Sequence, residues 1–176
     1  MQFSDCWEKF DMQARAAREQ KDYAKALELS RQALALAPNN PSVERGFALS
    51  LFHDKQYAAA LPLLEKHRLL HVERTLALLE LGEPQKALAT IGLTADEFEN
   101  AKLLGRVYIE LNKPMIGIPK LQALARKDLD GSLHEVLGHA YQALHQPNPA
   151  GLALRRASQL KKRHDAEMGM EIGPPK

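Results

Sequence analysis

Histidines are the residues of this chain best suited to metal binding or acid–base catalysis, and the sequence contains seven of them. His67 and His71 are four residues apart, a spacing that would place both on one side of a helix. That spacing crosses a predicted break between two helices, and no cysteine or third ligand accompanies it. His134 and His139 are five residues apart, which separates them by about 140° around a helix. We therefore expect no metal site.

The sequence carries no motif of a common enzyme active site. It lacks the phosphate-binding loop, the dinucleotide fingerprint, the HExxH zinc helix and the GxSxG nucleophile elbow. Asp96, Glu97 and Glu99 cluster, but negative charge at the start of a helix is favoured by the helix dipole. Cys6 is the only cysteine, so no internal disulfide or thiolate zinc cage can form. We expect a protein without catalytic activity and without a cofactor.

Length and composition fit one globular domain. The 176 residues are 45% hydrophobic and 26% charged, close to the average for folded proteins. The 24 basic residues are nearly balanced by 22 acidic ones, which argues against nucleic-acid binding. Residues 1–10 do not resemble a secretory signal, and no apolar stretch approaches the roughly 20 residues of a membrane span. These features predict a cytoplasmic protein that does not cross a membrane.

The spacing of small and apolar residues predicts helices and no sheet. Such residues recur every three or four positions between Tyr23 and Pro38, at Ala26, Leu27, Ser30, Ala33, Leu34 and Ala37. Asp22 is expected to cap this helix, and Asn40–Pro41 and Asn148–Pro149 are expected to start two others.

A further helix start is predicted in the segment LTADEF. Thr94 is its expected cap, with Glu97 three residues later, and Leu93 and Phe98 are placed to pack across the first turn. The helix should begin near Ala95. Runs of alternating apolar residues are absent, so no strand is expected.

Short turns between these helical segments divide the chain into helix pairs. The turns HDKQY, ELGEP, ELNKP and ALHQP each lie between two predicted helices. The five predicted pairs cover residues 4–38, 41–66, 71–91, 95–126 and 131–163. We expect the repeat domain to span residues 1–165. Residues 166–176 contain turn formers and no periodic stripe, which predicts a flexible tail.

Two pairs share the pattern Leu-Gly-x-x-Tyr in their first helix, at Leu104, Gly105 and Tyr108 and again 33 residues later at Leu137, Gly138 and Tyr141. A looser second-helix pattern occurs at Ala26, Ser30, Ala33 and Pro38, at Ala60, Leu64 and His67, and at Ala150, Leu154 and Ala157. The chain resembles the tetratricopeptide repeat family in these positions. The resemblance implies an all-α, right-handed superhelical solenoid of about five antiparallel helix pairs.

The repeats are degenerate, and one of them is short. Ala26 and Ala60 are separated by 34 residues, the period of the family, whereas Ala60 and Ala87 are separated by only 27. The central pair should therefore lack about two helical turns.

The family resemblance implies a concave groove, lined by the first helix of each pair, that binds another protein. An apolar centre lies between basic residues in this groove, which favours a client segment with apolar anchors and some acidic residues. The predicted lining residues are Arg15, Arg45, Leu49, Phe52, Leu76, Leu79, Lys102, Arg106, Ile109, His139 and Gln142. The alternative for Leu76 and Leu79 is packing between pairs in the shortened hairpin.

The resemblance also disfavours one class of partner. Family members that bind the acidic tails of Hsp70 and Hsp90 carry a clamp of Lys, Asn, Lys and Arg. The positions of its first Lys and Asn are occupied here by Asp11 and Arg15 in the first pair, and by Arg45 and Leu49 in the second. The clamp is not assembled.

Two functions remain open at this point. The first is a non-catalytic adaptor or dedicated chaperone, similar in length and repeat type to bacterial secretion chaperones. The second is a structural subunit or scaffold that self-associates or completes a larger assembly, with apolar surface of the shortened hairpin exposed for docking.

A basic run near the C-terminus contains Arg155, Arg156, Lys161, Lys162 and Arg163. Such a run can contact phosphate, but basic side chains also suit the C-terminal end of a helix. The sequence favours the second interpretation, a solvated end of the solenoid.

Overall fold

The computed structural model describes residues 4–92 and 96–171. Within these ranges the chain forms ten α-helices, one 3-10 helix and no strand, which confirms the predicted all-α class. The elements are α1 (Ser4–Glu19), α2 (Tyr23–Leu36), α3 (Pro41–His53), α4 (Tyr57–Lys66), η1 (Arg68–Leu70), α5 (His71–Glu80), α6 (Pro84–Thr90), α7 (Glu97–Glu110), α8 (Pro114–Ala125), α9 (Ser132–Ala143) and α10 (Pro147–Glu171).

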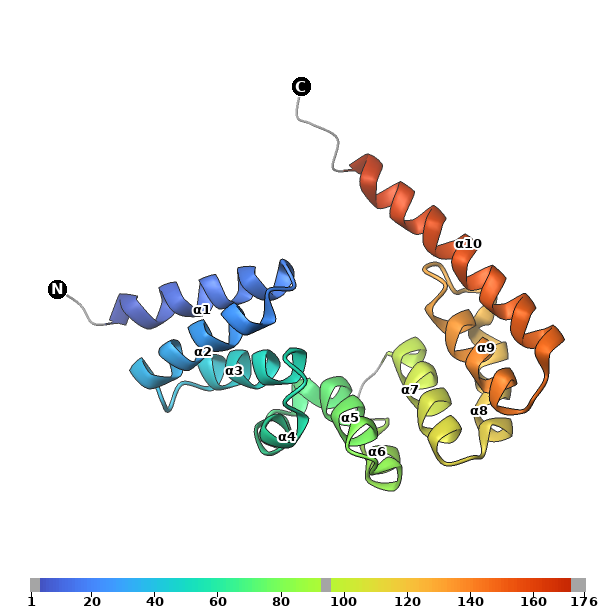
Figure 1. Cartoon of the computed structure of the whole chain (residues 1–176), viewed down its shortest axis with the longest axis horizontal. Coiled ribbons are helices and arrows are strands. Elements are labelled where there is room, and N and C mark those ends of the chain that lie inside the picture. The colour runs from blue at the N-terminus through green and yellow to red at the C-terminus, as the bar shows by residue number, and fades with distance from the viewer. Residues whose placement is uncertain (1–3, 93–95, 172–176) are drawn as a thin grey trace. The chain divides into compact units, whose positions relative to one another are not determined.

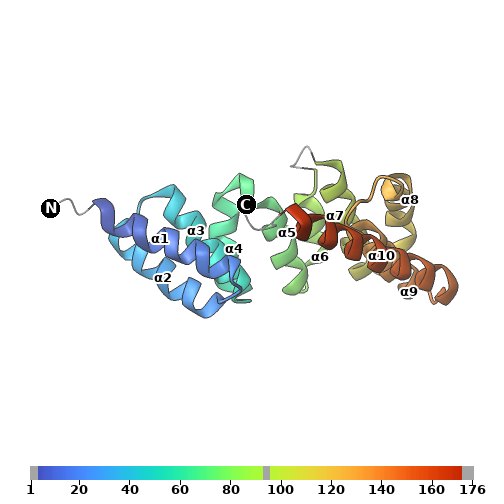
Figure 2. The same cartoon turned by 90° about the horizontal axis from the view of Figure 1, so that it is seen from above.

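The helices belong to two compact units, and the boundary between them lies at Glu83 and Pro84. In the first unit α1 packs on α2 and α3 packs on α4, with α2 against α3 and α4 against α5 (Figures 1 and 2). In the second unit α7 packs on α8 and α9 packs on α10, with α8 against α9. The boundary falls inside the third predicted pair, between α5 and α6.

Side-chain caps explain where several helices begin. Asp22 accepts a hydrogen bond from the Lys25 amide at 3.2 Å, and Asn40 accepts one from the Ser42 amide at 2.9 Å, as predicted. Helix α7 departs from the prediction, since it begins at Glu97 with Asp96 as its cap. Leu93, Thr94 and Ala95 lie outside the described residues.

The start of α10 also differs from the prediction. The helix begins at Pro147, so the predicted cap Asn148 is already inside its first turn. The first proline of the sequence Pro147-Asn148-Pro149 takes the favoured position at the start of the helix.

One turn geometry recurs at five helix ends. A residue in the left-handed region follows α1, α3, α5, α7 and α9, at Lys21, Lys55, Gly82, Asn112 and His145. In each turn the amide of this residue bonds the carbonyl three residues back, and the next amide bonds the carbonyl five residues back. This is the Schellman arrangement, which satisfies the last carbonyls of the helix and reverses the chain.

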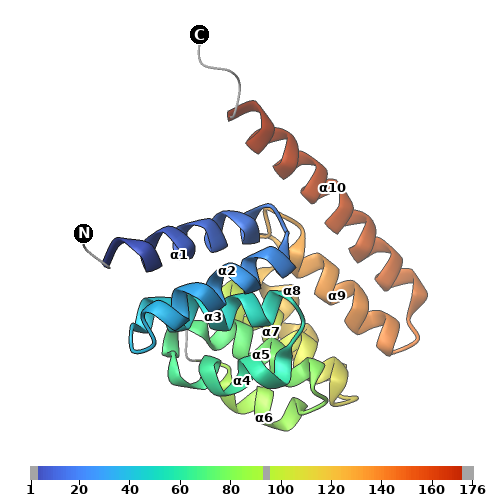
Figure 3. The ribbon, with the colours of Figure 1, turned by 60° about the vertical axis from the view of Figure 1, so that its left-hand side comes forward.

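Helix α10 is longer than the sequence predicted. It has 25 residues and continues past the start of α9, as Figures 1 and 3 show. Residues 166–171, which we expected to begin a flexible tail, are its last turns. Residues 172–176 lie outside the described part of the chain.

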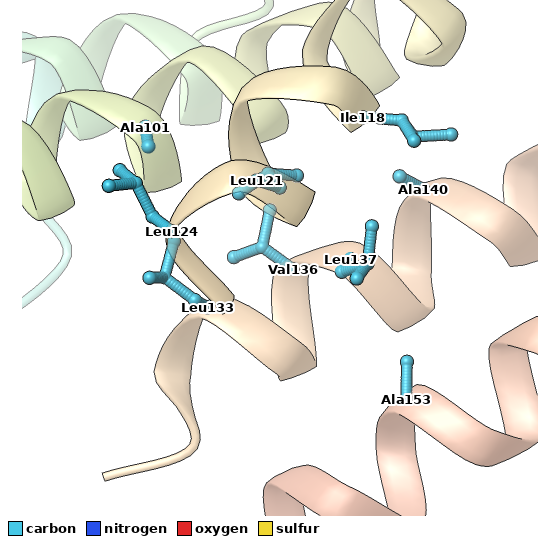
Figure 4. Close-up of a cluster of buried hydrophobic side chains, with 9 residues drawn as sticks. All are labelled: Ala101, Ile118, Leu121, Leu124, Leu133, Val136, Leu137, Ala140 and Ala153. Atoms are coloured by element: carbon cyan, nitrogen blue, oxygen red, sulfur yellow. The ribbon is translucent and has the colours of Figure 1, made fainter. Parts of the chain in front are cut away.

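Close helix contacts in the second unit depend on glycine. The Gly117 position on α8 faces the backbone of Gly105 on α7, and a Cβ at Gly117 would lie 3.2 Å from the Gly105 Cα. A Cβ at Gly138 on α9 would lie 2.6 Å from Leu154 Cγ on α10. Around these contacts lies a core of Ala101, Ile118, Leu121, Leu124, Leu133, Val136, Leu137, Ala140 and Ala153, shown in Figure 4.

Replacing Gly138 should test this close contact. We expect Gly138→Leu to lower the free energy of unfolding by about 1–3 kcal/mol, because the added side chain overpacks the contact with Leu154. Urea unfolding followed by circular dichroism measures the change. The control is Gly151→Ala on α10, where a Cβ would meet only the tip of Arg155 at 3.8 Å. An equal loss in both variants would contradict the close packing.

Gly131, directly before α9, combines a left-handed backbone with a second constraint. Its φ is 85°, and a Cβ there would collide with the backbone carbonyl of Ala157 on α10. Gly82 has a similar φ of 73° but no atom within 4 Å of the same position. Both alanine substitutions should therefore cost about 1–2 kcal/mol of backbone strain, and Gly131→Ala should cost more. Equal midpoints of urea unfolding for the two variants would rule out the collision.

Candidate partner-binding site

The first unit contains a cavity of about 350 Å³ between α1, α3 and η1. A smaller cavity of about 260 Å³ adjoins it toward the start of α1, since both are lined by Asp11, Arg15 and Ser42. The larger cavity is lined further by Arg18, Glu19, Arg45, Gly46, Leu49, Leu69 and Leu70, and the smaller by Trp7, Glu8 and Met12. We call the two together the α1–α3 groove.

Arg18 joins the helices beneath the groove. Its Nη1 donates hydrogen bonds to the Gly46 carbonyl at 3.1 Å and to Ser50 Oγ at 2.8 Å, both on α3. Ser50 Oγ in turn lies 2.6 Å from Ser30 Oγ on α2, in the buried interior. Burial lowers the pKa of Arg18, while Asp11 acts in the opposite direction. The Arg18 side chain is therefore engaged in contacts within the fold.

Asp11 and Gly46 form the wall between α1 and α3. Asp11 is only 8% exposed, and its carboxylate accepts a hydrogen bond from Arg15 at 3.5 Å. Gly46 leaves room for this carboxylate, because a Cβ there would lie 2.7 Å from Asp11 Oδ1. The charge of Arg15 is therefore partly neutralised by the buried Asp11 carboxylate.

Arg45 differs from the other two arginines of the groove. It forms no hydrogen bond or ion pair with the described residues, although it lines the same cavity as Leu49 and Leu69. Leu69 is 74% exposed, whereas its neighbour Leu70 is buried against the core. The groove thus presents an unpaired cation beside exposed apolar surface.

The structure brings together only part of the predicted groove in the first unit. Arg15, Arg45 and Leu49 line one cavity, as described above. Phe52 packs against the core and makes edge contacts with Tyr57 and His53, with ring centroids 5.7 Å and 5.4 Å apart. Leu76 and Leu79 are half-buried on α5, outside the lining of the α1–α3 groove.

The other predicted residues belong to the second unit. Lys102 lines a cavity of about 330 Å³ together with Phe98 on α7 and Leu129 in the turn before α9, and it pairs with Glu99 at 2.7 Å. Ile109 packs against the core of the second unit. Arg106, His139 and Gln142 are exposed. The predicted groove is therefore distributed over both units.

Carboxylates organise the turn beside the second cavity. Asp128 is buried and accepts hydrogen bonds from the Gly131 amide, the His134 amide and His134 Nδ1, the last at 2.6 Å. Burial alone would raise the pKa of Asp130, but the hydrogen bonds that it accepts from Ser132 and the charge of Lys102 hold that pKa below its ordinary value. This turn positions Leu129, which is 70% exposed.

The histidines singled out by spacing have separate partners. His67 Nε2 lies 3.1 Å from Glu44 on α3, and His71 Nδ1 lies 3.4 Å from the Arg68 carbonyl. In the described ranges no three His, Cys, Asp or Glu side chains converge as metal ligands would. None of the described helices combines the length and apolar character needed to cross a bilayer.

Several residues of the α1–α3 groove were not predicted from the sequence. Arg18 and Gly46 gave no signal, because their roles depend on contacts between helices. Leu69 and Leu70 did carry one, since two adjacent leucines stand in a predicted break between helices. An apolar pair in such a break is an indication of burial or binding.

Comparison with known proteins identifies the repeat. The tetratricopeptide repeat family model matches residues 17–75, from the end of α1 through half of α5. Residues 17–75 are thus similar to tetratricopeptide repeats. The resemblance drawn from the sequence is therefore confirmed.

Solved structures of tetratricopeptide proteins share the fold. MamA MSR-1 C2 is 16% identical with a TM-score of 0.63, covering 89% of this chain and 95% of its own. MamA RS-1 is 18% identical with a TM-score of 0.65, covering 92% and 97%. YrrB, a tetratricopeptide protein with an unusual peptide-binding site, is 15% identical with a TM-score of 0.59, covering 97% and 98%. A search of curated proteins finds no significant match.

An ion-pair cluster next to the groove should make the tetratricopeptide region sensitive to acid. Lys66 Nζ donates a 2.6 Å hydrogen bond to Glu44, and this bond, aided by His67, holds the pKa of Glu44 below its ordinary value. A lowered carboxyl pKa stabilises the fold above the ordinary pKa and ceases to do so as pH falls through the folded value.

We therefore expect Glu44→Gln to reduce the loss of stability between about pH 5 and pH 3. Thermal unfolding across this range measures it. Glu28→Gln is the control, because Glu28 is 60% exposed and pairs within α2. If the stability of Glu44→Gln falls as steeply with decreasing pH as that of the wild type, the cluster does not contribute to the acid sensitivity.

Proposed function

We propose that this protein is a non-catalytic interaction module that holds a segment of a client protein in the α1–α3 groove. The tetratricopeptide match and fold support a protein–protein interaction module. The peptide-binding site of YrrB supports a peptide or protein as the ligand. The specific role we propose is that of a cytoplasmic adaptor or dedicated chaperone.

The unpaired Arg45 carries the proposal for the α1–α3 groove. A client carboxylate can pair with Arg45 without breaking a contact of the fold, whereas Arg18 is engaged with Gly46 and Ser50. An apolar client side chain beside that carboxylate would cover Leu49 and the exposed Leu69. The expected client segment therefore contains an acidic residue next to an apolar anchor.

Residues of the second unit remain proposed contacts of the same client. Lys102 lines a cavity there with the exposed Leu129, but its Nζ pairs with Glu99 at 2.7 Å, so a client carboxylate would compete with this ion pair. Arg106, His139 and Gln142 are exposed and accessible to a client. Ile109 is less accessible to a client than these three residues, because it packs against the core of the second unit.

A random peptide library displayed on phage tests the proposal with the full chain as bait. Selected peptides should contain Asp or Glu close to Leu, Ile or Phe. Fluorescence polarisation of a selected peptide should show about tenfold weaker binding to Leu69→Ser and to Arg45→Gln. The matched controls are Leu36→Ser and Arg31→Gln, since Leu36 is 49% exposed and Arg31 is a surface arginine, both on α2.

Failure of the selection, or equal weakening in the controls, would contradict the assignment of the groove. The competing proposal is a scaffold subunit whose exposed Met12 and Leu69 join copies of the chain. Light scattering separates the two. An oligomer that dissociates in Leu69→Ser, together with no selected peptide, would support the scaffold and overturn the client-binding role.

A further inference from the structure

One side of α10 forms a basic surface. Exposed residues recur on it at spacings of three and four, so they share one side of the helix. The members are Leu152, Arg155, Arg156, Gln159, Lys162 and Arg163. We call this set the α10 basic face; it contains four cations and no acidic residue.

The helix end does not explain these cations. The sequence favoured a solvated helix terminus, because basic side chains stabilise the last turn of a helix. Helix α10 instead continues to Glu171, so Arg163 lies about two turns before its end and Arg155 more than four. The dipole effect is confined to the last turn. The expectation from the sequence is therefore wrong about the position of this run at the end of a helix, although its side chains are exposed as expected.

Contacts within the fold do not explain the cations either. Arg163 Nε lies 3.6 Å from Glu167 Oε1, and both side chains are more than half exposed. Arg155 Nε donates to the Gly151 carbonyl at 3.1 Å, a bond that leaves its charge uncompensated. Arg156 and Lys162 make no hydrogen bond or ion pair with the described residues. Most of this charge is thus available to a partner.

The other two sides of α10 have different characters. Ala153, Ala157 and Leu160 are buried and continue the packing seam of the helix, which lies against α9. A third side, with Lys161 and Asp165, lines a cavity of about 440 Å³ that also contains Glu135 of α9. Lys161 is thus the one cation of the basic run that lies off the α10 basic face. The course of the helix can be followed in Figure 3.

A basic surface on one side of a straight helix fits a flat anionic partner. A helix in a nucleic-acid groove faces phosphates on two sides, whereas four of the five Lys and Arg residues of α10 lie on one. An acidic protein helix would need an apolar seam to pack on, but Leu152 is the only large apolar residue of the face. An anionic bilayer presents a plane of negative potential that attracts clusters of four to eight Lys and Arg residues.

We propose that the α10 basic face docks the protein on the surface of an anionic lipid bilayer. The four cations contact lipid phosphates and carboxylates, and Leu152, which is 65% exposed, reaches the boundary of the acyl region. The association is peripheral, because the apolar seam of α10 is occupied by α9. This surface is separate from the α1–α3 groove and does not depend on the client.

Vesicle sedimentation of the full chain tests the proposal. The protein should sediment with vesicles of phosphatidylcholine and phosphatidylserine, remain in solution with phosphatidylcholine alone, and be released by added salt. The double variant Arg156→Gln and Lys162→Gln should bind about 25-fold more weakly, since each cation near the surface contributes about fivefold. The matched control removes two exposed lysines of the first unit, by Lys9→Gln and Lys25→Gln.

Several outcomes would overturn the proposal. One is equal binding to both kinds of vesicle, and another is equal weakening in the control. A third is no binding to vesicles together with an Arg156- and Lys162-dependent shift of a DNA duplex or a polyglutamate peptide, which would assign the face to that other polyanion. All substituted side chains are exposed, so circular dichroism should show unchanged unfolding in every variant. Peptide binding in the α1–α3 groove should also be unchanged.

Discussion

The close approach of helix backbones is the constraint on which this structure depends. At Gly105 and Gly117, and between Gly138 and Leu154, the neighbouring helix occupies the place of a side chain. In the first unit Ala26, Ala48 and Ala60 have no exposed surface, which shows that alanine fills the same kind of position. Dispersion and apolar burial act over these short distances, and a larger side chain would separate the helices.

The functional surfaces follow from this packing. Gly46 leaves room for the Asp11 carboxylate, and Arg18 crosses from α1 to reach Ser50 on α3. The hydrogen bonds of Arg18 to α3 and the ion pair of Arg15 with Asp11 hold these two side chains within the fold, so Arg45 is the arginine of the groove left for a partner. The same logic applies to α10, where one side packs on α9 and the opposite side leaves Arg156 and Lys162 without an ion pair among the described residues. Internal packing thus decides which charges are available for binding.

Much of the fold was predictable because it depends on local sequence. The periodic apolar stripe, the caps Asp22 and Asn40, and the repeated turns are set by residues within a few positions of one another. The left-handed residues Lys21 and Lys55 are 34 apart and Lys55 and Gly82 are 27 apart, which matches the period and the shortened repeat read from the alanines. The cap of α7 is Asp96, where Thr94 was predicted. Both residue types are favoured N-caps and stand two positions apart, and Asp is the stronger of the two.

The sequence by itself determined the all-α class, four of the five helix pairs and the absence of a conventional enzyme motif, since periodicity and turn chemistry are local properties. Only the tertiary structure decided which of the predicted groove residues meet. It placed Arg15, Arg45 and Leu49 around one cavity with Leu69, and it left Phe52 and Ile109 packed against the cores. It also extended α10 to Glu171, beyond the basic run that ends at Arg163. Exposure and charge pairing depend on neighbours distant in the sequence, which no local pattern records.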